Sequence, residues 1–365
     1  MILPPHPSAI LPAGVAEILR SKSAEAEVIR DLHPDQLALI YTQQWFRMLL
    51  PEGYPLTSPG KPPLSLSQLV RLEEGLSWAD GSVGWMVTLC SGAGWFAGFF
   101  PPAAYSDIFS DKQLCVAGSG APSGEAHVVP GGYRISGRWD YASGALHATA
   151  FTANCVIVDN GQAVLTDDGS PLVRPFLFRK EEVSVDKNWN TVGLIATGSH
   201  AFELRDTEVP ADRCFDIAPS QAKAQHPIYR YPFLQLAEAT LAANLSGMGM
   251  HFLDCANPFF NQRIHRGRVP AGAAEEINAA LEEARNTIQT KRTEFYKTLD
   301  RSWERQTDFD AVSRCSRELV SAVRSMVDKL YPYGGLGAAR PDTEINRVWR
   351  DLHTASQHNL LVFGR

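Results

Sequence analysis

The chain changes its pattern of apolar residues twice, and these changes limit the possible folds more than any other feature. From about Ala13 to Ser110, apolar residues recur at intervals of three and four, which is typical of helices that bury one face. Between Gln113 and Arg213 the chain instead shows short β-rich runs separated by Gly, Pro and Asn. Helical spacing returns beyond Pro232, in segments at 234–255, 271–303, 309–330 and 342–362. The sequence therefore predicts helices, then a β-rich part, then helices.

The β-rich part predicts an antiparallel sheet or barrel. Its strands are expected in the runs LCVAG, AHVV, YRISGRWDYA, ATAFTANCVIV, RPFLFR and HAFEL. No helical segment separates these runs, whereas a parallel nucleotide-binding sheet has helices between its strands. Pro130-Gly131-Gly132 predicts a hairpin turn. We therefore expect a mainly helical α+β protein with an N-terminal helical domain (1–112), a central β domain (113–215) and a C-terminal helical domain (216–365).

Two glycine-rich segments come close to nucleotide-binding motifs. GSGAPS at 118–123 lacks the third glycine of the dinucleotide fingerprint and leads into a hairpin, so no helix N-terminus follows to receive a pyrophosphate. We interpret this segment as a loop. YGGLGAA at 333–339 follows a helical pattern, and we interpret it as the turn that ends a helix.

The most apolar stretch, from Gly84 to Tyr105, approaches the length that spans a membrane. It contains glycines and ends in Pro101-Pro102, and its small residues would let another helix approach closely. A buried core helix is the better interpretation. Asp80 is placed to cap its first turn.

The bulk composition excludes several classes of partner. The net charge is −6 and the isoelectric point is about 5.9, which argues against binding to nucleic acid or to an anionic membrane. The six cysteines form no CxxC pair, so neither a zinc knuckle nor a small disulfide framework is indicated. The N-terminus, MILPPHPSAILPAG, has no basic leader and no unbroken apolar run. These features favour the cytoplasm.

Four segments, in this order, resemble the acyl-CoA dehydrogenase superfamily, and specifically its branch of two-component flavin monooxygenases. They are DGSVGW (80–85), GGYRISGRWDYASGALHA (131–148), WNTVGLIATGSHAFELRDTEVP (189–210) and NRVWRDLHTASQH (346–358). The resemblance runs from about Ala24 to the C-terminus. It implies a central antiparallel β-barrel domain, a C-terminal four-helix bundle and assembly as a homotetramer.

In this superfamily the flavin ring lies between the β domain and the C-terminal helices. The WITN motif of the dehydrogenases matches the segment from Tyr141 to Gly144, which implies that Tyr141 flanks the ring and that Ser143 forms a hydrogen bond near N5. Trp85 matches the tryptophan of the GSTGW motif, which lies against flavin or substrate. From the residues alone, Tyr141 and Ser143 would end a strand and begin a turn, and Trp85 would be a core residue.

Further cofactor contacts are implied by a loop that the monooxygenases write GLRGTGSN. Thr197 and Ser199 retain its hydroxyls, but Ile195 and His200 replace its arginine and asparagine. Arg179 is a candidate for a flavin phosphate, although an exposed charged turn explains it equally well. Ser119 is a further candidate contact.

The choice of reaction depends mainly on His358. We expect Asp351, Thr354 and His358 to share one face of a C-terminal helix, whereas His353 and His358 lie too far apart around that helix to chelate a metal. Where many dehydrogenases place a glutamate base, this chain has His358 and Asn359, and the resemblance implies a histidine acid/base of the monooxygenases. Glu238 matches the base of some other dehydrogenases. Its alternative interpretation is a solvated residue in a first helical turn.

The resemblance thus predicts a flavin-dependent oxidoreductase, favoured as a monooxygenase that hydroxylates a small aromatic or heteroatom-containing substrate through a flavin hydroperoxide. Reduced FMN or FAD would come from a separate reductase, with His358 and Ser143 as catalytic residues and no metal. The alternatives are an FAD-dependent acyl-CoA dehydrogenase that uses Glu238, and a flavin-free binding or structural relative.

Overall fold

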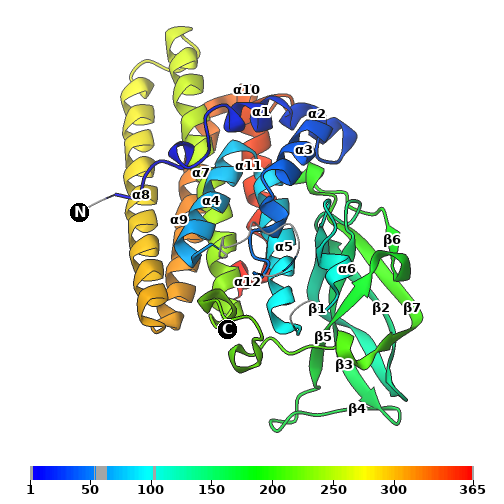
Figure 1. The fold of residues 1–365 in the computed structure, drawn as a ribbon. Coiled ribbons are helices and arrows are strands. Elements are labelled where there is room, and N and C mark those ends of the chain that lie inside the picture. The colour runs from blue at the N-terminus through cyan, green and yellow to red at the C-terminus, as the bar shows by residue number, and fades with distance from the viewer. Residues whose placement is uncertain (1–2, 53, 55–63, 102–103, 364–365) are drawn as a thin grey trace.

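The computed structural model describes residues 3–52, 54, 64–101 and 104–363. Helices form the first part, a sheet follows, and long helices return after it (Figure 1). The helices of the first part are α1 (Val15–Ser21), α2 (Ser23–Ile29), α3 (Pro34–Thr42), α4 (Leu66–Ala79), α5 (Gly81–Gly94) and α6 (Ser106–Phe109). The predicted order of helices, β-rich part and helices is therefore present.

The apolar stretch after Gly84 forms α5 and the 3₁₀ turn η3 (Trp95–Phe99), and both are largely buried. Asp80 caps α5 as predicted, because its Oδ1 accepts the Val83 N–H at 2.8 Å. A side chain at Gly84 would collide with the α4 backbone at Ser77, so the close helix approach requires glycine there. No helix in the described part of the chain has the length and apolarity needed to cross a membrane.

The sheet is mixed and open, which corrects the predicted antiparallel barrel. Its strands are β1 (Val116–Val129), β2 (Gly132–Ala142), β3 (Ala150–Asp159), β4 (Gln162–Ala163), β5 (Val173–Arg179), β6 (Ser184–Asp186) and β7 (His200–Pro210). They are ordered β4-β3-β1-β2-β7-β6, with β5 also paired to β3. β1 and β3 run parallel. β2 runs antiparallel to β1, and the chain reverses once more before β3. β3 therefore runs in the same direction as β1, and it lies beside β1 on the side away from β2.

The GSGAPS segment is not a loop. β1 continues through it with an irregularity between Ser119 and Gly124, where the register against β3 shifts. β3 pairs with the start of this run at Gly118 and Ser119 and again beyond it from Gly124, where β2 also pairs, and the sequence pattern alone did not indicate this pairing. The predicted hairpin at Pro130-Gly131-Gly132 is present, since Val129 pairs with Gly132 across the turn.

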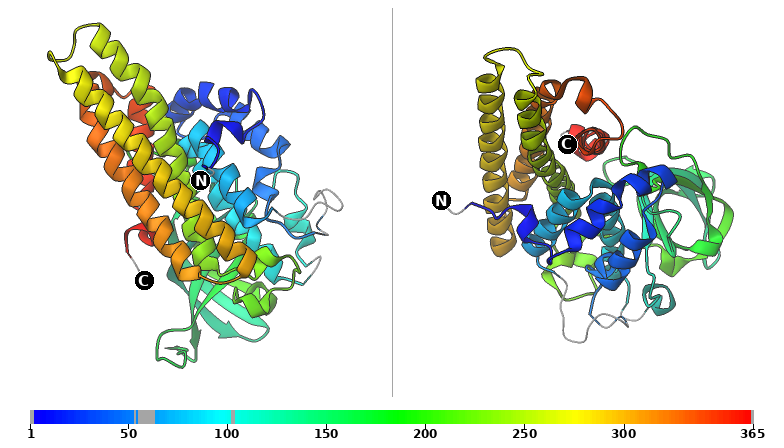
Figure 2. Two further views of the ribbon diagram at one scale, coloured as in Figure 1. Left: turned by 90° about the vertical axis from the view of Figure 1, so that its left-hand side faces the viewer. Right: turned by 90° about the horizontal axis from the view of Figure 1, so that it is seen from above.

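The later helices are α7 (Phe233–His265), α8 (Ala273–Arg305), α9 (Phe309–Leu330), α10 (Gly335–Ala338), α11 (Glu344–Ala355) and α12 (Asn359–Val362). α7 packs against α8, α9 and α11, and α4 joins the same group (Figure 2). α7 runs ten residues beyond the predicted end, with Pro258 inside it. The predicted helix at 342–362 is divided, because α11 ends at Ala355 and α12 begins at Asn359.

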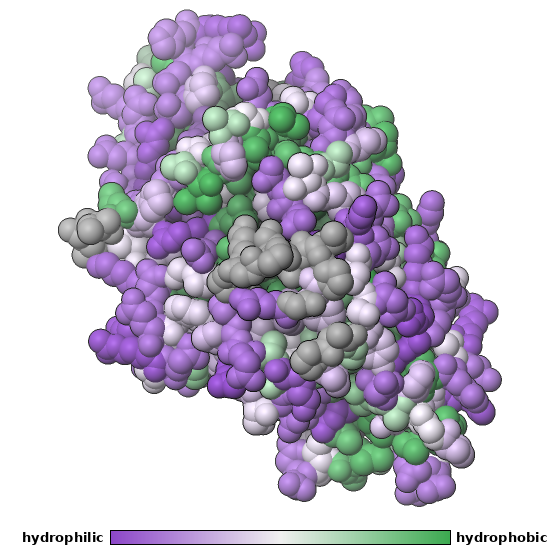
Figure 3. Space-filling model, viewed as in Figure 1, coloured by the Kyte–Doolittle hydropathy of each residue, from purple (hydrophilic) through white to green (hydrophobic). Residues whose placement is uncertain are grey.

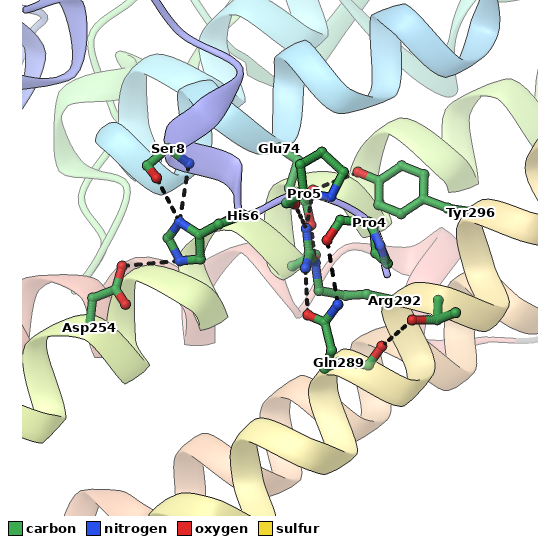
Figure 4. Close-up of polar contacts among 11 residues, drawn as sticks. Pro4, Pro5, His6, Ser8, Glu74, Asp254, Gln289, Arg292 and Tyr296 are labelled. Atoms are coloured by element: carbon green, nitrogen blue, oxygen red, sulfur yellow. Dashed lines mark hydrogen bonds and ion pairs between the residues drawn. The ribbon is translucent and has the colours of Figure 1, made fainter. Parts of the chain in front are cut away.

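A buried ion pair connects α4 to α8 beneath the N-terminal segment (Figure 4). The guanidinium of Arg292 donates to both carboxylate oxygens of Glu74 at 2.7 and 2.8 Å, and Tyr296 donates to the same carboxylate at 2.6 Å. Arg292 also donates to the Pro5 carbonyl at 3.0 Å. The outer side of α8 is hydrophilic, as the space-filling view shows (Figure 3). The contacts of Arg292 and Tyr296 with Glu74 hold α4 in place beside α5, which carries Trp85.

Candidate functional site

The turn that follows β2 has an unusual backbone. Tyr141 has a φ of +69° and Gly144 a φ of +75°, and Ser143 lies between them. A positive φ is strained for a tyrosine, and such residues persist where the surroundings fix them, often at functional sites. The Gly144 N–H donates to the Thr197 carbonyl at 2.9 Å, which ties this turn to the loop before β7.

Three buried hydroxyls form a chain between the turn and the loop. Ser143 Oγ lies 2.8 Å from Ser199 Oγ, and Ser199 Oγ lies 2.7 Å from Thr197 Oγ1. Thr197 Oγ1 lies 2.8 Å from the Leu194 carbonyl oxygen. The resemblance named all three hydroxyl residues, and the fold brings them together.

The direction of this chain follows from counting protons. A carbonyl oxygen accepts only, so Thr197 uses its single hydroxyl proton on Leu194. Ser199 must then donate to Thr197, and Ser143 must donate to Ser199. Ser143 Oγ is left with lone pairs and no proton for a further partner, so it offers a ligand a hydrogen-bond acceptor.

Helix α11 holds the loop from two sides. Arg350 Nη1 donates to the Val192 carbonyl at 2.5 Å, and Oδ1 of Asp351 accepts the Leu194 N–H at 2.5 Å. Between these contacts, a side chain at Gly193 would collide with the α11 backbone at Arg350. The adjacent residues Arg350 and Asp351 therefore fix the two peptide groups on either side of Gly193, directly before the Leu194 carbonyl at which the hydroxyl chain ends.

Asp351 is buried in a polar pocket. Together with Ser23, Ser77, Asp80, Gly81, Met248, His251, Arg347 and Val348, it lines a cavity of about 10 Å³. Burial is the main cause that raises the pKa of Asp351 to about 8; the nearby carboxylates of Asp80 and Glu27 act in the same direction, and the hydrogen bond from Leu194 acts against it. The carboxyl group is thus protonated over much of the neutral range.

Trp85 and His358 lie together, with ring centroids 6.0 Å apart in an edge-to-face arrangement. His358 is not on the helix that carries Asp351, so the predicted shared face with Thr354 is wrong. α11 ends at Ala355, and His358 caps α12 by accepting the Leu360 N–H on Nδ1 at 3.3 Å. Burial lowers the pKa of His358, which favours a neutral imidazole. With Nδ1 accepting, the hydrogen-bond pattern assigns the ring proton to Nε2.

Helix α5 connects the two groups. The turn at Ser143 packs onto α5, where the Cys90 thiol lies 3.5 Å from the Ser143 carbonyl oxygen. A side chain at Gly144 would collide with the side chains of Cys90 and of Met86, the residue that follows Trp85. Helix α5 therefore contacts the turn at Ser143, this turn contacts the loop before β7, and that loop contacts α11. His358, which follows α11, contacts Trp85 on α5.

The remaining predicted residues lie apart from these contacts. Tyr141 is 73% exposed and meets only the edge of Trp189 among its ring contacts in the described residues, at 6.2 Å between centroids. Ser119 lies at the irregularity in β1, and Arg179 pairs with Asp107. Within the described part of the chain, no hydrogen bond, ion pair or ring contact joins Ser119 or Arg179 to the hydroxyl chain or to His358.

Glu238, the alternative base, is buried, so its interpretation as a solvated first-turn residue is wrong. Its Oε1 accepts from Arg317 on α9 at 2.5 Å. This ion pair joins α7 to α9.

Sequence reasoning missed two contributors. No role was assigned from the sequence to Arg350 or to Trp189, which donates through Nε1 to the Leu194 carbonyl at 2.9 Å. Both lie inside the matched segments, so the signal was present. Only the packing of α11 on the loop shows what they do.

Comparison with known proteins identifies the family of the chain. Residues 239–363 match the family model of the acyl-CoA dehydrogenase C-terminal domain. A pigment production hydroxylase of Rhodococcus sp. (strain ATCC 21145) is 30% identical, over 82% of this chain and 79% of its own length. The flavin-dependent monooxygenase oxygenase subunit HsaA of Rhodococcus jostii (strain RHA1) is 27% identical, over 93% and 91%.

Among solved structures, XiaF from Streptomyces sp. in complex with FADH2 and glycerol superposes with a TM-score of 0.81. It is 23% identical, and the match covers 95% of this chain and 89% of that one. At this identity the likeness establishes the fold.

Proposed function

The chain belongs to the flavin-dependent monooxygenase branch of the acyl-CoA dehydrogenase superfamily, and from this premise we propose that it uses reduced FMN or FAD to hydroxylate a small aromatic or heteroatom-containing compound. The hydroxyl chain that ends at Ser143 carries this proposal. Ser143 Oγ offers a hydrogen-bond acceptor, and a reduced flavin ring has an N–H that can donate to it. The corresponding nitrogen of an oxidised ring is itself an acceptor, so Ser143 Oγ fits it less well.

The aromatic residues support a planar ligand beside Ser143. Tyr141 presents an exposed ring at the end of β2, on the backbone that also positions Ser143. Trp85 is 7% exposed and comes from the helix against which that turn packs. Hydroxyl and aromatic groups together suit a ring system with polar edges and apolar faces. Ser119 and Arg179 have weaker support as cofactor contacts, because Arg179 is already paired with Asp107.

When bound, reduced flavin would supply the two electrons that activate dioxygen, of which one oxygen atom is inserted into the substrate and the other leaves as water. His358 binds and orients the substrate by donating from Nε2 to a phenolic or similar oxygen, since Nδ1 is engaged with Leu360. Trp85 covers one side of the imidazole and excludes water from it. Asp351 and Arg350 position the loop that carries Thr197 and Ser199.

The wider setting is also part of the proposal. A separate reductase supplies the reduced flavin, because the relative HsaA is named an oxygenase subunit and no dinucleotide fingerprint is present in this sequence. We propose three domains with the predicted boundaries at 112 and 215, a four-helix bundle in the C-terminal part, a homotetramer, and a cytoplasmic location without nucleic-acid or membrane partners. No metal takes part in the reaction.

Oxygen incorporation tests this function. The full-length protein, loaded anaerobically with reduced FMN or FAD, is mixed with ¹⁸O₂ and a panel of monocyclic phenols, and the products are analysed by mass spectrometry. We expect at least one phenol to gain a single labelled oxygen atom. Absence of label throughout the panel, together with reduction of bound oxidised FAD by an acyl-CoA thioester, would establish the dehydrogenase alternative instead.

A further inference from the structure

A second cluster of polar side chains joins α7 to α11, away from the hydroxyl chain. His251 and Cys255 are four residues apart on α7, which places them on one face of the helix. Glu344 lies in the first turn of α11. The imidazole, thiol and carboxylate ligand atoms of these three residues all lie within 4.8 Å of one another.

The cluster is partly preorganised. Nε2 of His251 lies 2.9 Å from Oε1 of Glu344, and the imidazole is buried with 5% of its side chain exposed. Glu344 is 41% exposed, so solvent reaches one side of the cluster. Ligand atoms this close need only small rotations to surround one ion, because donor atoms in a tetrahedral zinc site lie about 3–4 Å apart at bond lengths of about 2.0–2.3 Å.

The charged side chains around the cluster favour the binding of a cation. Arg20 Nε lies 3.4 Å from Glu344 Oε1, and its guanidinium stacks on Trp78 at 4.4 Å. Asp254, the neighbour of Cys255, accepts from Trp78 Nε1 at 2.8 Å and lies 3.4 Å from His6 (Figure 4). The carboxylates of Glu344, Asp254 and Asp80 outnumber the guanidinium groups of Arg20 and Arg347 by one. A divalent ion together with a cysteine thiolate would make the group neutral.

We propose that His251, Cys255 and Glu344 bind one Zn²⁺, with water in the fourth position. Nitrogen, thiolate and carboxylate ligands suit zinc, whereas magnesium and calcium take oxygen ligands. On binding, the Cys255 thiol loses its proton to solvent and no oxidation state changes. The ion links α7 to α11, the helix whose Arg350 and Asp351 hold the loop. This proposal does not depend on the proposed function.

Metal binding by the full-length protein tests it directly. The protein is stripped with a chelator, equilibrated with ZnCl₂, passed through a desalting column and measured for zinc. In parallel it is titrated with Co²⁺ and its absorption spectrum recorded. We expect one zinc per chain and a near-ultraviolet thiolate-to-cobalt band. Zinc affinity should fall at least about tenfold in Cys255→Ser and in His251→Gln, and the cobalt band should disappear in Cys255→Ser.

Cys315→Ser is the matched control, since Cys315 is also a partly buried helix cysteine, and it should keep both the zinc and the band. If a buried variant fails to fold by circular dichroism, Glu344→Gln, at a more exposed position, tests the same ligand set by the same loss of affinity. Failure of the wild type to retain zinc would refute the site. Equal retention by wild type and the folded ligand variants would also refute it, by placing the metal elsewhere.

Discussion

Replacing Thr197 with valine tests the direction of the hydroxyl chain. Valine has nearly the shape of threonine but cannot donate to the Leu194 carbonyl or accept from Ser199. The Leu194 carbonyl keeps the Trp189 indole as a donor. Ser199 is then free to donate to Ser143, and Ser143 regains a proton that it can offer to an oxidised flavin. We therefore expect the preference for reduced flavin to weaken.

The size of the effect follows from one hydrogen bond. A single neutral hydrogen bond contributes about 1 kcal/mol net. A change of that size lowers the ratio of affinities for reduced and oxidised flavin about fivefold, or the two-electron potential of the bound flavin by about 20 mV. The variant should also lose about 1–2 kcal/mol of unfolding free energy, because two hydrogen bonds of a buried hydroxyl are removed.

The assay is equilibrium binding of FMN and FAD in both oxidation states, with the potential measured against a redox dye. Thr293→Val is the matched control, since Thr293 is a buried threonine on α8 whose hydroxyl donates to the Gln289 carbonyl at 2.7 Å. It should lose similar stability and leave the potential unchanged. The reasoning fails if Ser143→Ala shifts the potential and Thr197→Val does not.

Three further predictions concern the groups around the hydroxyl chain. His358→Asn keeps a residue type that caps helices, but it should slow hydroxylation about 100-fold or more while flavin affinity stays near that of the wild type. Burial lowers the pKa of His358, so the acid limb of the wild-type pH–rate profile should lie below pH 6.5. This limb should be absent from the variant. Asp351→Asn keeps an acceptor for Leu194, whereas Asp351→Leu leaves that N–H unpaired and should cost about 1–3 kcal/mol by chemical denaturation. Folding raises the pKa of Asp351 from 3.8 to about 8, so the unfolded chain ionises first and the wild type should lose stability relative to Asp351→Asn as pH rises through this window; parallel stability curves would contradict the assignment. Glu238→Gln should leave oxygen insertion within about twofold of wild type while lowering the melting temperature through loss of the Arg317 pair, and a collapse of turnover in a folded variant would reinstate Glu238 as a base.

Sequence patterns predicted those parts of the fold that depend on local periodicity. The cap at Asp80, the hairpin after Val129 and the helix at 309–330 are all present. Errors arose where distant partners decide the structure. β1 is parallel to β3 because these two strands lie side by side, and β1 continues through GSGAPS because β3 pairs with its first residues and both β3 and β2 pair from Gly124 onward. Neither effect is encoded in a short window.

The candidate site divides in the same way. The sequence by itself determined which residue types are available, including the hydroxyls of Ser143, Thr197 and Ser199, the ring of Trp85 and the imidazole of His358. The tertiary structure alone decided their contacts. It placed three hydroxyls in one directed chain, moved His358 from the α11 helix to a cap that fixes its ring proton, and engaged Glu238 with Arg317. The physical reason is that proton positions and pKa values depend on neighbours from other segments, which residue spacing along the chain does not specify.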